Sequence, residues 1–418
     1  MTQETKAQNG ADGQSIGGGN PPYWTAPSTR SRGPRWRGVI AVAAVGALLS
    51  SALTAGVVKA FDDNSSATVT PAAAKQSTPA VVGKAGGPNW VSVAAAVEPT
   101  VVAVQVQAAD GSGGEGSGVI LDQHGRVLTN NHVVAAAGSG GTISVTLADG
   151  RIYGASVTGT DPSTDLAVIT LKNPPSGLKP STFGDSAKAA VGDPVMTVGN
   201  PLGLSETVTT GIISAVNRPV TTSASTEQQQ QSPFAEQQPQ TEQVVTNAIQ
   251  TDAAINPGNS GGALVDSSGR VIGITSSIAS LGQQTFGSSD QSGSIGLGFA
   301  IPSNEATRVS GQLIAKGTVQ HAYLGITLTD GTAVVNGTHR EAAVIGSVTN
   351  GTPAAKAGLK AKDAITAIDG TPLDGADSLV AQVRALPPGT RINLTLVRGG
   401  RQQTVSLTLA ARPAVNSE

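Results

Sequence analysis

Three side chains with the chemistry of amide hydrolysis stand in the order His132, Asp165 and Ser260 along this chain of 418 residues. A serine hydroxyl attacks a carbonyl carbon when a neighbouring base removes its proton, and imidazole is the base that titrates near neutral pH. A carboxylate that accepts a hydrogen bond from the other ring nitrogen fixes the tautomer and stabilises the imidazolium. The three residue types therefore predict acyl transfer through a serine nucleophile, provided that the fold brings them together.

Ser260 lies in a glycine-rich segment, Asn256–Gly262, which reads Asn-Pro-Gly-Asn-Ser-Gly-Gly. Small neighbours allow a substrate backbone to come close, and they allow successive N–H groups to point at one place where an oxyanion can bind. An ordinary turn has the same composition. The segment by itself therefore leaves a nucleophile turn and a plain turn as alternatives.

His132 and Asp165 each lie next to an expected strand. His132 follows Val127–Thr129 and precedes apolar residues, whereas Asp165 opens a nearly apolar run, Leu166–Leu171. A half-buried structural histidine and a turn aspartate are the alternatives for the two positions. Of the four histidines in the chain, the others lie in a turn, at a domain junction and in a polar loop: His124, His321 and His339.

The composition favours a β-rich body with many turns. Only 13% of the residues are charged, about half of the usual ~25%, and the chain has 53 glycines. Lys and Arg number 26 and Asp and Glu number 28, so no basic field supports binding to nucleic acid. Cysteine is absent, which excludes disulfides, a thiol nucleophile and thiolate metal sites.

The N-terminal part predicts a membrane anchor. Residues 1–37 are polar and predict a disordered cytoplasmic tail, and residues 38–58 are uncharged and long enough for a transmembrane helix of ~30 Å. Four arginines precede this span and one lysine follows it, which places the N-terminus in the cytoplasm and the rest of the chain outside. A cleaved signal peptide is the alternative, because Val58-Lys59-Ala60 resembles a cleavage site. Residues 59–89 read as a flexible linker.

Short apolar or alternating runs between glycine-rich turns predict a strand-rich domain over residues 90–317. Two polar loops interrupt it, a Gln-rich one at Asn217–Val244 and a Gly/Ser-rich one at Ser280–Ser294. We interpret the first as a tolerated surface insertion. The expected strands follow a short helix at Trp90–Pro99 and are Thr100–Val106, Ser117–Leu121, Val127–Thr129, Thr142–Leu147, Arg151–Gly159, Pro194–Gly199 and Thr207–Val216.

The C-terminal part predicts a helix followed by a second, smaller domain. Apolar residues at helical spacing predict a helix over Ser303–Lys316, and Gly317 is its expected end. A strand begins at Tyr323, and a second helix covers Ser378–Leu386. Alternating runs on both sides of Gly399-Gly400 predict a hairpin.

Taken together, these motifs resemble the HtrA (DegP-like) family of serine endopeptidases over roughly Val91 to the C-terminus. The Cys-free chain with its expected anchor is similar to the membrane-bound actinobacterial members. The resemblance rests on the triad segments and on stretches in register with them: Thr129–Val134, Thr164–Val168, Val198–Gly203, Gln250–Asn256, Gly258–Gly262 and Gly296–Pro302.

The resemblance implies a mainly β fold. A chymotrypsin-like double β-barrel would occupy residues 90–317, a small α+β PDZ domain would occupy residues 320–412, and the single transmembrane helix would precede both. The active site would lie in the cleft between the barrels, with His132 as base, Asp165 as its partner and Ser260 as nucleophile. The family further implies a homotrimer and no metal or organic cofactor.

The same resemblance implies how a substrate is held near Ser260. The backbone N–H groups of Gly258 and Ser260 would form the oxyanion hole, with Asn259 shaping the turn. Ile255 and Leu297 would line a shallow apolar pocket for the residue before the scissile bond. No aspartate is expected at the base of this pocket, so a trypsin-like preference for basic residues is not expected.

A second binding site is implied in the C-terminal domain. Tyr323, Leu324, Gly325 and Ile326 resemble the carboxylate-binding loop of PDZ domains, where a C-terminal peptide adds as a strand. A plain edge strand is the alternative for this segment. Lys362 departs from the family pattern at a position where glycine is common, and we expect it to alter only a surface turn.

The resemblance implies a serine endopeptidase that cleaves misfolded or regulatory polypeptides outside the cytoplasmic membrane, in protein quality control. A peptide-binding or chaperone-like scaffold with an idle or gated triad is the alternative. A lipase-type hydrolase is disfavoured, because no Gly-x-Ser-x-Gly elbow occurs in a strand-to-helix context. Loops beside the active site are often ordered by a ligand in this family, so an incompletely formed oxyanion hole at rest is a further hypothesis.

Overall fold

The computed structural model describes residues 87–138, 140–200, 207–222, 244–277 and 296–413. The expected cytoplasmic tail, the span over residues 38–58 and most of the linker lie outside these residues, as does the loop at Ser280–Ser294. Among the described residues, no helix combines the length and hydropathy that crossing a bilayer requires.

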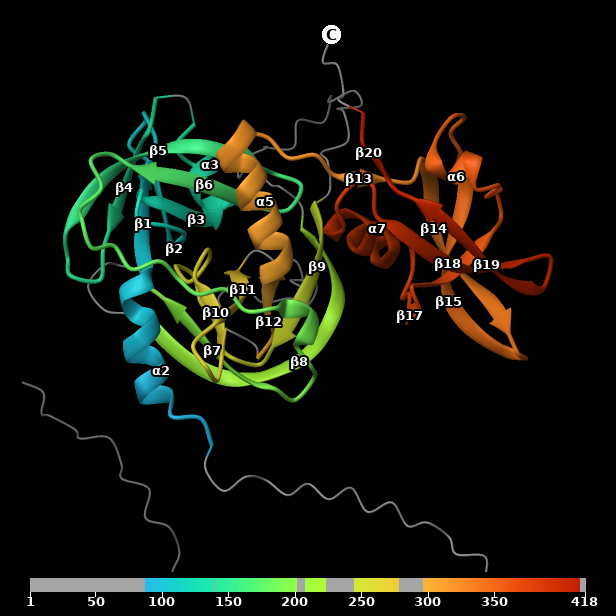
Figure 1. The fold of residues 1–418 in the computed structure, drawn as a ribbon, viewed down its shortest axis with the longest axis horizontal. Coiled ribbons are helices and arrows are strands. Elements are labelled where there is room, and N and C mark those ends of the chain that lie inside the picture. Colours follow the sequence, from blue (N-terminus) through green and yellow to red (C-terminus); the bar gives the residue numbers. More distant parts are fainter. Residues whose placement is uncertain (1–86, 139, 201–206, 223–243, 278–295, 414–418) are drawn as a thin grey trace, which may run out of the picture. The chain divides into compact units, whose positions relative to one another are not determined.

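Six strands close into a first barrel in the order β1-β2-β3-β6-β5-β4 (Figure 1). Side chains alternate across each strand, so β1 places Val102 and Val104 in the interior of this barrel and Val101 in a second apolar cluster. The strands are β1 Val101–Gln107, β2 Gly113–Ile120, β3 Arg126–Asn130, β4 Thr142–Thr146, β5 Ile152–Asp161 and β6 Leu166–Leu171.

Six further strands close into a second barrel in the order β10-β11-β12-β9-β8-β7. Its interior contains Val195, Ile213 and Leu264, which are buried in one cluster. The strands are β7 Pro194–Gly199, β8 Thr207–Thr222, β9 Val244–Thr251, β10 Ala263–Asp266, β11 Val271–Ser276 and β12 Gly298–Pro302. A short 3-10 turn, η2 at Ser186–Lys188, precedes β7.

An apolar core joins the two barrels. It takes Leu128 and Val168 from the first barrel, Met196 and Ile274 from the second, and side chains from two helices. Helix α2 (Trp90–Val97) contributes from the N-terminal side, continuing into a 3-10 turn, η1 at Glu98–Thr100. Helix α5 (Ser303–Lys316) contacts β5 and β6 of one barrel and β11 and β12 of the other (Figure 1). The shared core therefore fixes one barrel against the other.

The C-terminal part is a sheet in the order β14-β15-β16-β18-β19, with β17 paired to β16 and with β13 paired to β20. Its core contains Ile345, Ile365 and Leu379, all fully buried. The elements are β13 Ala322–Tyr323, β14 Ile326–Val335, β15 Thr338–Val348, α6 Pro353–Lys356, β16 Ala364–Ile368, β17 Thr371–Pro372, α7 Ala376–Ala385, β18 Arg391–Arg398, β19 Arg401–Thr408 and β20 Ala410–Ala411.

The mainly β architecture of two barrels and a small α+β domain is confirmed, and α5 ends at Gly317 as predicted, with φ +73°. Two local predictions are wrong. Strand β2 begins at Gly113, before the expected start at Ser117, because residues 113–119 pair with β1. Strand β8 continues to Thr222, inside the expected insertion, because it pairs with β9. The alternative of a plain edge strand over Tyr323–Ile326 does not hold, because Gly325 has φ +81° between β13 and β14.

Candidate active site

His132 and Asp165 lie against each other in the first barrel. Strand β3 leads into a short helix, α3 (Asn131–Ala135), which carries His132, and Asp165 immediately precedes β6. The Nδ1 atom of His132 lies 3.0 Å from Oδ1 and 2.9 Å from Oδ2 of Asp165, and the His132 backbone N–H donates to Oδ1 at 3.0 Å. The imidazole is therefore held by its Nδ1 side, which leaves Nε2 for other chemistry.

The backbone of Asp165 is held in an uncommon conformation. Its φ is +55°, in the left-handed region that aspartate tolerates better than most residues. Its carbonyl accepts hydrogen bonds from the Asn131 backbone N–H at 3.0 Å and from the Asn130 side-chain amide at 2.9 Å. Its own N–H donates to Pro162 O at 3.3 Å. These three hydrogen bonds hold the backbone of Asp165 in its uncommon conformation and so fix where its carboxylate lies. Such strained backbone positions are concentrated at functional sites.

Residues of the second barrel connect the Asp165 carboxylate to the Ser260 turn. Ser276, the last residue of β11, donates its hydroxyl to Asp165 Oδ2 at 3.2 Å. The residue before it, Thr275, is hydrogen-bonded to the Ser260 turn in both directions. Gly261 N–H donates to Thr275 O at 2.8 Å, and Thr275 N–H donates to Gly262 O at 3.0 Å. Strand β11 therefore fixes the position of the Asp165 carboxylate relative to the serine turn.

Ser117 of β2 fastens the same turn to the first barrel. Its hydroxyl donates to Gly258 O at 2.8 Å, and its backbone N–H donates to Ser260 O at 2.7 Å. The two barrels approach so closely here that a Cβ on Gly261 would lie 2.2 Å from Ser117 O. Because Gly261 also has φ +85°, no other residue fits this position without rearrangement.

The expected oxyanion donors lie in the same turn. Gly258 has φ +89°, and among the described residues neither the Gly258 N–H nor the Ser260 N–H has a hydrogen-bond partner. Asn259 is 1% exposed, and both polar atoms of its side-chain amide also lack a partner. The two N–H groups are therefore free to bind an oxygen atom, while Asn259 fills the space behind the turn.

The hydroxyl of Ser260 does not contact His132. Its Oγ lies 2.5 Å from the Ser277 hydroxyl and accepts a hydrogen bond from the Ser277 backbone N–H at 3.0 Å. Among the described residues, no hydrogen bond joins Ser260 to the His132 ring. All three residues of the predicted triad thus lie around one place, with the serine turned toward β11.

The two residues expected in the substrate pocket lie near β12. Ile255 is 2% exposed, and it packs so closely on Gly298 that a Cβ there would lie 2.8 Å from Ile255 Cδ1. Leu297 is partly buried against Val220, Ala248 and Phe299. The structure places Ile255 beside the residue that follows Leu297, and Ile255 itself is covered.

The expected peptide-binding loop borders a hollow of about 210 Å³ between β14 and α7. Gly325 is required there, because a Cβ would lie 2.3 Å from Thr352 Cβ. Within the described part of the chain, the N–H groups of Leu324 and Gly325 donate to no residue. The apolar lining of the hollow comes from Leu324, Ile326, Leu328, Leu379, Val380 and Val383.

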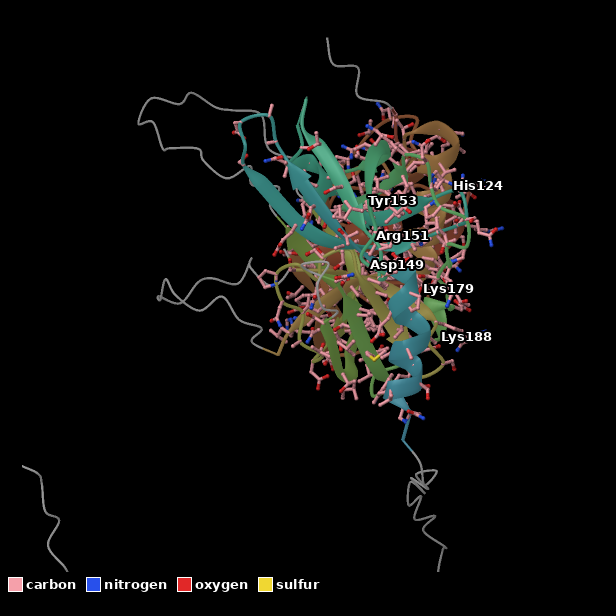
Figure 2. The ribbon with its side chains drawn as sticks, turned by 90° about the vertical axis from the view of Figure 1, so that its left-hand side faces the viewer. His124, Asp149, Arg151, Tyr153, Lys179 and Lys188 are labelled. Atoms are coloured by element: carbon pink, nitrogen blue, oxygen red, sulfur yellow. The ribbon has the colours of Figure 1, made fainter. Side chains whose placement is uncertain are left out.

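A different hollow, of about 330 Å³, lies on the first barrel and includes Leu147, Leu178 and Lys179 in its lining. Two of its charged side chains, Asp149 and Arg151, pair with each other, and Figure 2 labels both. Arg151 lies 2.6 Å from Asp149, and its guanidinium also lies over the ring of Tyr153. The hydrogen bond from Arg151 stabilises the ionised carboxylate and so lowers the pKa of Asp149. No cluster of side chains suited to a metal ion occurs within the described ranges.

Four titratable side chains gather where α5 meets the end of β5. His321 Nε2 lies 2.9 Å from Asp161 Oδ1, and Arg308 lies 3.8 Å from Glu305. Burial raises the pKa of the Glu305 carboxyl to about 7, against the opposing attraction of Arg308 and His321. This cluster is largely buried, and Ser260 is not part of it.

Three residues that complete the site were missed from the sequence: Ser117, Ser276 and Ser277. Their only local signal is a small polar residue where an apolar strand begins or ends, which is common in any barrel. Each acts on a residue in a distant segment, so their roles become visible only once the strand registers are known.

Comparison with known proteins bears on both domains of the chain. The trypsin-like peptidase domain matches residues 116–274, and the PDZ domain matches residues 322–409. Serine protease PepD of Mycobacterium tuberculosis is 42% identical over 324 residues, which are 76% of this chain and 65% of PepD. Periplasmic serine endoprotease DegP of Salmonella typhimurium is 40% identical over 299 residues, 70% of this chain and 56% of DegP. This chain thus spans less than two thirds of either relative.

One solved structure is similar over almost its entire length. The HtrA-type protease AlgW, in complex with a tripeptide, is 33% identical and superposes with a TM-score of 0.54. The similarity covers 79% of this chain and 99% of the AlgW chain. Barrels, connecting helix and C-terminal domain are therefore all included in the match.

Proposed function

Because the chain belongs to the HtrA-type family of trypsin-like serine proteases, we propose that it is a serine endopeptidase whose triad is His132, Asp165 and Ser260. The observation that carries the proposal is the connection through β11. This strand donates to Asp165 through Ser276 and also pairs with the turn that carries Ser260. Acyl transfer through a serine requires a nucleophile, a base and a group that orients the base. The pair of Asp165 and His132 and the Ser260 turn, all held through β11, provide these groups.

The proposed mechanism assigns one task to each group. The Ser260 hydroxyl rotates toward His132, Nε2 takes its proton, and Oγ attacks the peptide carbonyl carbon. Asp165 keeps Nδ1 protonated and stabilises the imidazolium that forms. The N–H groups of Gly258 and Ser260 bind the oxyanion. Nε2 then protonates the leaving amine, and water hydrolyses the acyl-enzyme by the same proton transfers in reverse order.

We assign polypeptides as substrates, with an apolar residue before the scissile bond beside Ile255 and Leu297. C-terminal peptides would bind at Tyr323–Ile326, where the N–H groups of Leu324 and Gly325 are available for a carboxylate and the adjoining hollow is apolar. Apolar side chains with several available N–H groups are the combination that such a peptide end requires.

We further propose that residues 38–58 anchor the protein in the cytoplasmic membrane and that residues 90–412 act outside it, in protein quality control, as a homotrimer. The support for this location is the arginine-flanked apolar span in the sequence. Protease added to intact cells is expected to degrade the body of the protein. Full protection of that body would reverse the topology.

A scaffold that binds peptides without cleaving them is the second candidate function. The observation in its favour is the contact of Ser260 with Ser277 in place of His132. Casein hydrolysis by the full chain in mild detergent distinguishes the two functions. The endopeptidase is expected to lose about 10⁶-fold in turnover on Ser260→Ala substitution. Equal rates in the two proteins would exclude Ser260 as the nucleophile, and no hydrolysis in either would favour the scaffold.

A further inference from the structure

We propose that Ser277 is a positioning residue that holds the Ser260 hydroxyl away from His132 in the free protein, a role that rests on the proposed function of Ser260 as nucleophile. Ser277 directly follows β11 and is partly buried. It provides two groups to a single atom, Ser260 Oγ: its backbone N–H at 3.0 Å and its hydroxyl at 2.5 Å.

Two neighbouring serines, Ser276 at the end of β11 and Ser277 directly after it, bind different atoms of the site. Successive side chains of an extended segment point to opposite sides. Ser276 accordingly reaches Asp165, and Ser277 reaches Ser260. The two hydrogen bonds between Thr275 and the serine turn fix this register. The contact of Ser277 with the nucleophile therefore follows from strand geometry and does not depend on an exposed, freely rotating side chain.

The contact competes with catalysis whichever hydroxyl donates. A serine hydroxyl has one hydrogen to donate and two lone pairs to accept with. If Ser260 donates to Ser277, its proton is directed away from His132. If Ser277 donates, it joins the Ser277 N–H in occupying the lone pairs that must attack the carbonyl carbon. In the first arrangement Ser260 must leave the Ser277 hydroxyl before it can pair with Nε2. In the second it must leave before its lone pair can attack the carbonyl carbon.

The size of the effect follows from a two-state equilibrium of the Ser260 side chain. One net hydrogen bond changes such a population by about three- to tenfold. Removing the Ser277 hydroxyl leaves the backbone N–H contact in place, so the change is a partial release of Ser260. The triad pair of His132 and Asp165 is untouched by this change, because neither residue contacts Ser277.

The test is the second-order rate constant for labelling of the full chain by a fluorophosphonate probe, measured from pH 5 to pH 9. Ser277→Ala and Ser277→Gly are expected to label about three to ten times faster than the unmodified protein at every pH, with the same midpoint. Ser277→Thr keeps a hydroxyl and is expected to label at nearly the original rate. Ser268→Ala, at an exposed turn serine of the same barrel, is the matched control and is expected to change nothing.

A purely structural role for Ser277 predicts slower labelling in the alanine and glycine variants, and this result would overturn the proposal. Unchanged labelling rates in the alanine and glycine variants would overturn it as well. Equal labelling rates in the Ser277→Thr and Ser277→Ala variants would also overturn it. The Ser260→Ala variant distinguishes a failure of the proposed role of Ser277 from a failure of the proposed function of Ser260 as nucleophile. Labelling that persists without Ser260 refutes the assignment of the nucleophile, whereas labelling that is lost confirms the premise and leaves the Ser277 variants to decide the inference.

Discussion

The short turn Asp161–Asp165 has an aspartate at each end, and each aspartate pairs with a histidine. The two pairs have the same nitrogen–oxygen distance but differ in the ring nitrogen used and in exposure. In each pair a ring nitrogen lies 2.9 Å from a carboxylate oxygen. His132 uses Nδ1, which leaves Nε2 for other chemistry, whereas His321 uses Nε2 and has no partner for Nδ1 among the described residues. The side chain of His132 is 26% exposed and that of His321 is 10% exposed.

The surroundings decide what each pair can do. Asp165 accepts from Ser276, on the strand that holds the serine turn, so its pair lies beside the proposed nucleophile turn. Asp161 accepts from Thr164 at 2.6 Å, within its own turn, and its histidine faces the buried Glu305 and Arg308. The comparison teaches that a histidine and carboxylate pair is not by itself a catalytic site. It becomes one when the free ring nitrogen has a nucleophile and a substrate can enter.

The largest effect that separates the two pairs is expected from Asp165→Asn. An amide at this position favours the wrong imidazole tautomer, so turnover of casein should fall about 10⁴-fold while the fold persists. The measurement is initial rates with the full chain, together with circular dichroism.

The matched variant for this loss is Asp161→Asn, at the other end of the same turn. It should change turnover by less than about tenfold, because Asp161 contacts no reacting group and its main cost is one weakened hydrogen bond of ~1 kcal/mol. A comparable loss in both variants would mean that the two pairs act as one unit.

A smaller effect, on stability, is expected from Glu305→Gln. The unfolded carboxyl releases its proton near pH 4.5 and the folded one near pH 7, so the folded state binds more protons in between. The free energy of unfolding therefore falls as the pH rises through this window. At about 1.4 kcal/mol per pH unit, the loss amounts to ~3 kcal/mol.

Glutamine mimics the protonated form, so the variant should be more stable than the unmodified chain at pH 8 and equally stable near pH 4.5. Urea unfolding at the two pH values measures this. The exposed Glu341→Gln is the control and should show no such difference. A variant that keeps the full pH dependence would exclude Glu305 as its source.

The smallest effect is expected from His321→Asn. The substitution removes the bond to Asp161 Oδ1 while Thr164 continues to satisfy the other oxygen, so the free energy of unfolding should fall by about 1–2 kcal/mol. Casein turnover should stay within about tenfold. Exposed His124→Asn is the control and should leave both quantities unchanged. A turnover loss on the scale of Asp165→Asn would give His321 a part in the chemistry.

Local chemistry was sufficient for much of the fold. Short apolar or alternating runs predicted the strands of the first barrel, β7 and β8 of the second, and the C-terminal hairpin. The helical spacing ending at Gly317 predicted α5 from Ser303 to Lys316. These features depend on neighbours within a few residues, which the sequence displays directly. The extent of β8 depended instead on its pairing with β9 across a long connection.

For the active site, the sequence by itself determined which side chains can do the chemistry, because imidazole, carboxylate and hydroxyl act through their own pKa and bonding capacity. The placement of His132 at 2.9 Å from Asp165 agrees with that expectation. Only the tertiary structure decided that Asp161 and His321 form a second, buried pair and that Ser277 contacts the nucleophile. Those contacts join segments far apart in the chain, and their geometry arises from strand register and barrel packing, which no local pattern records.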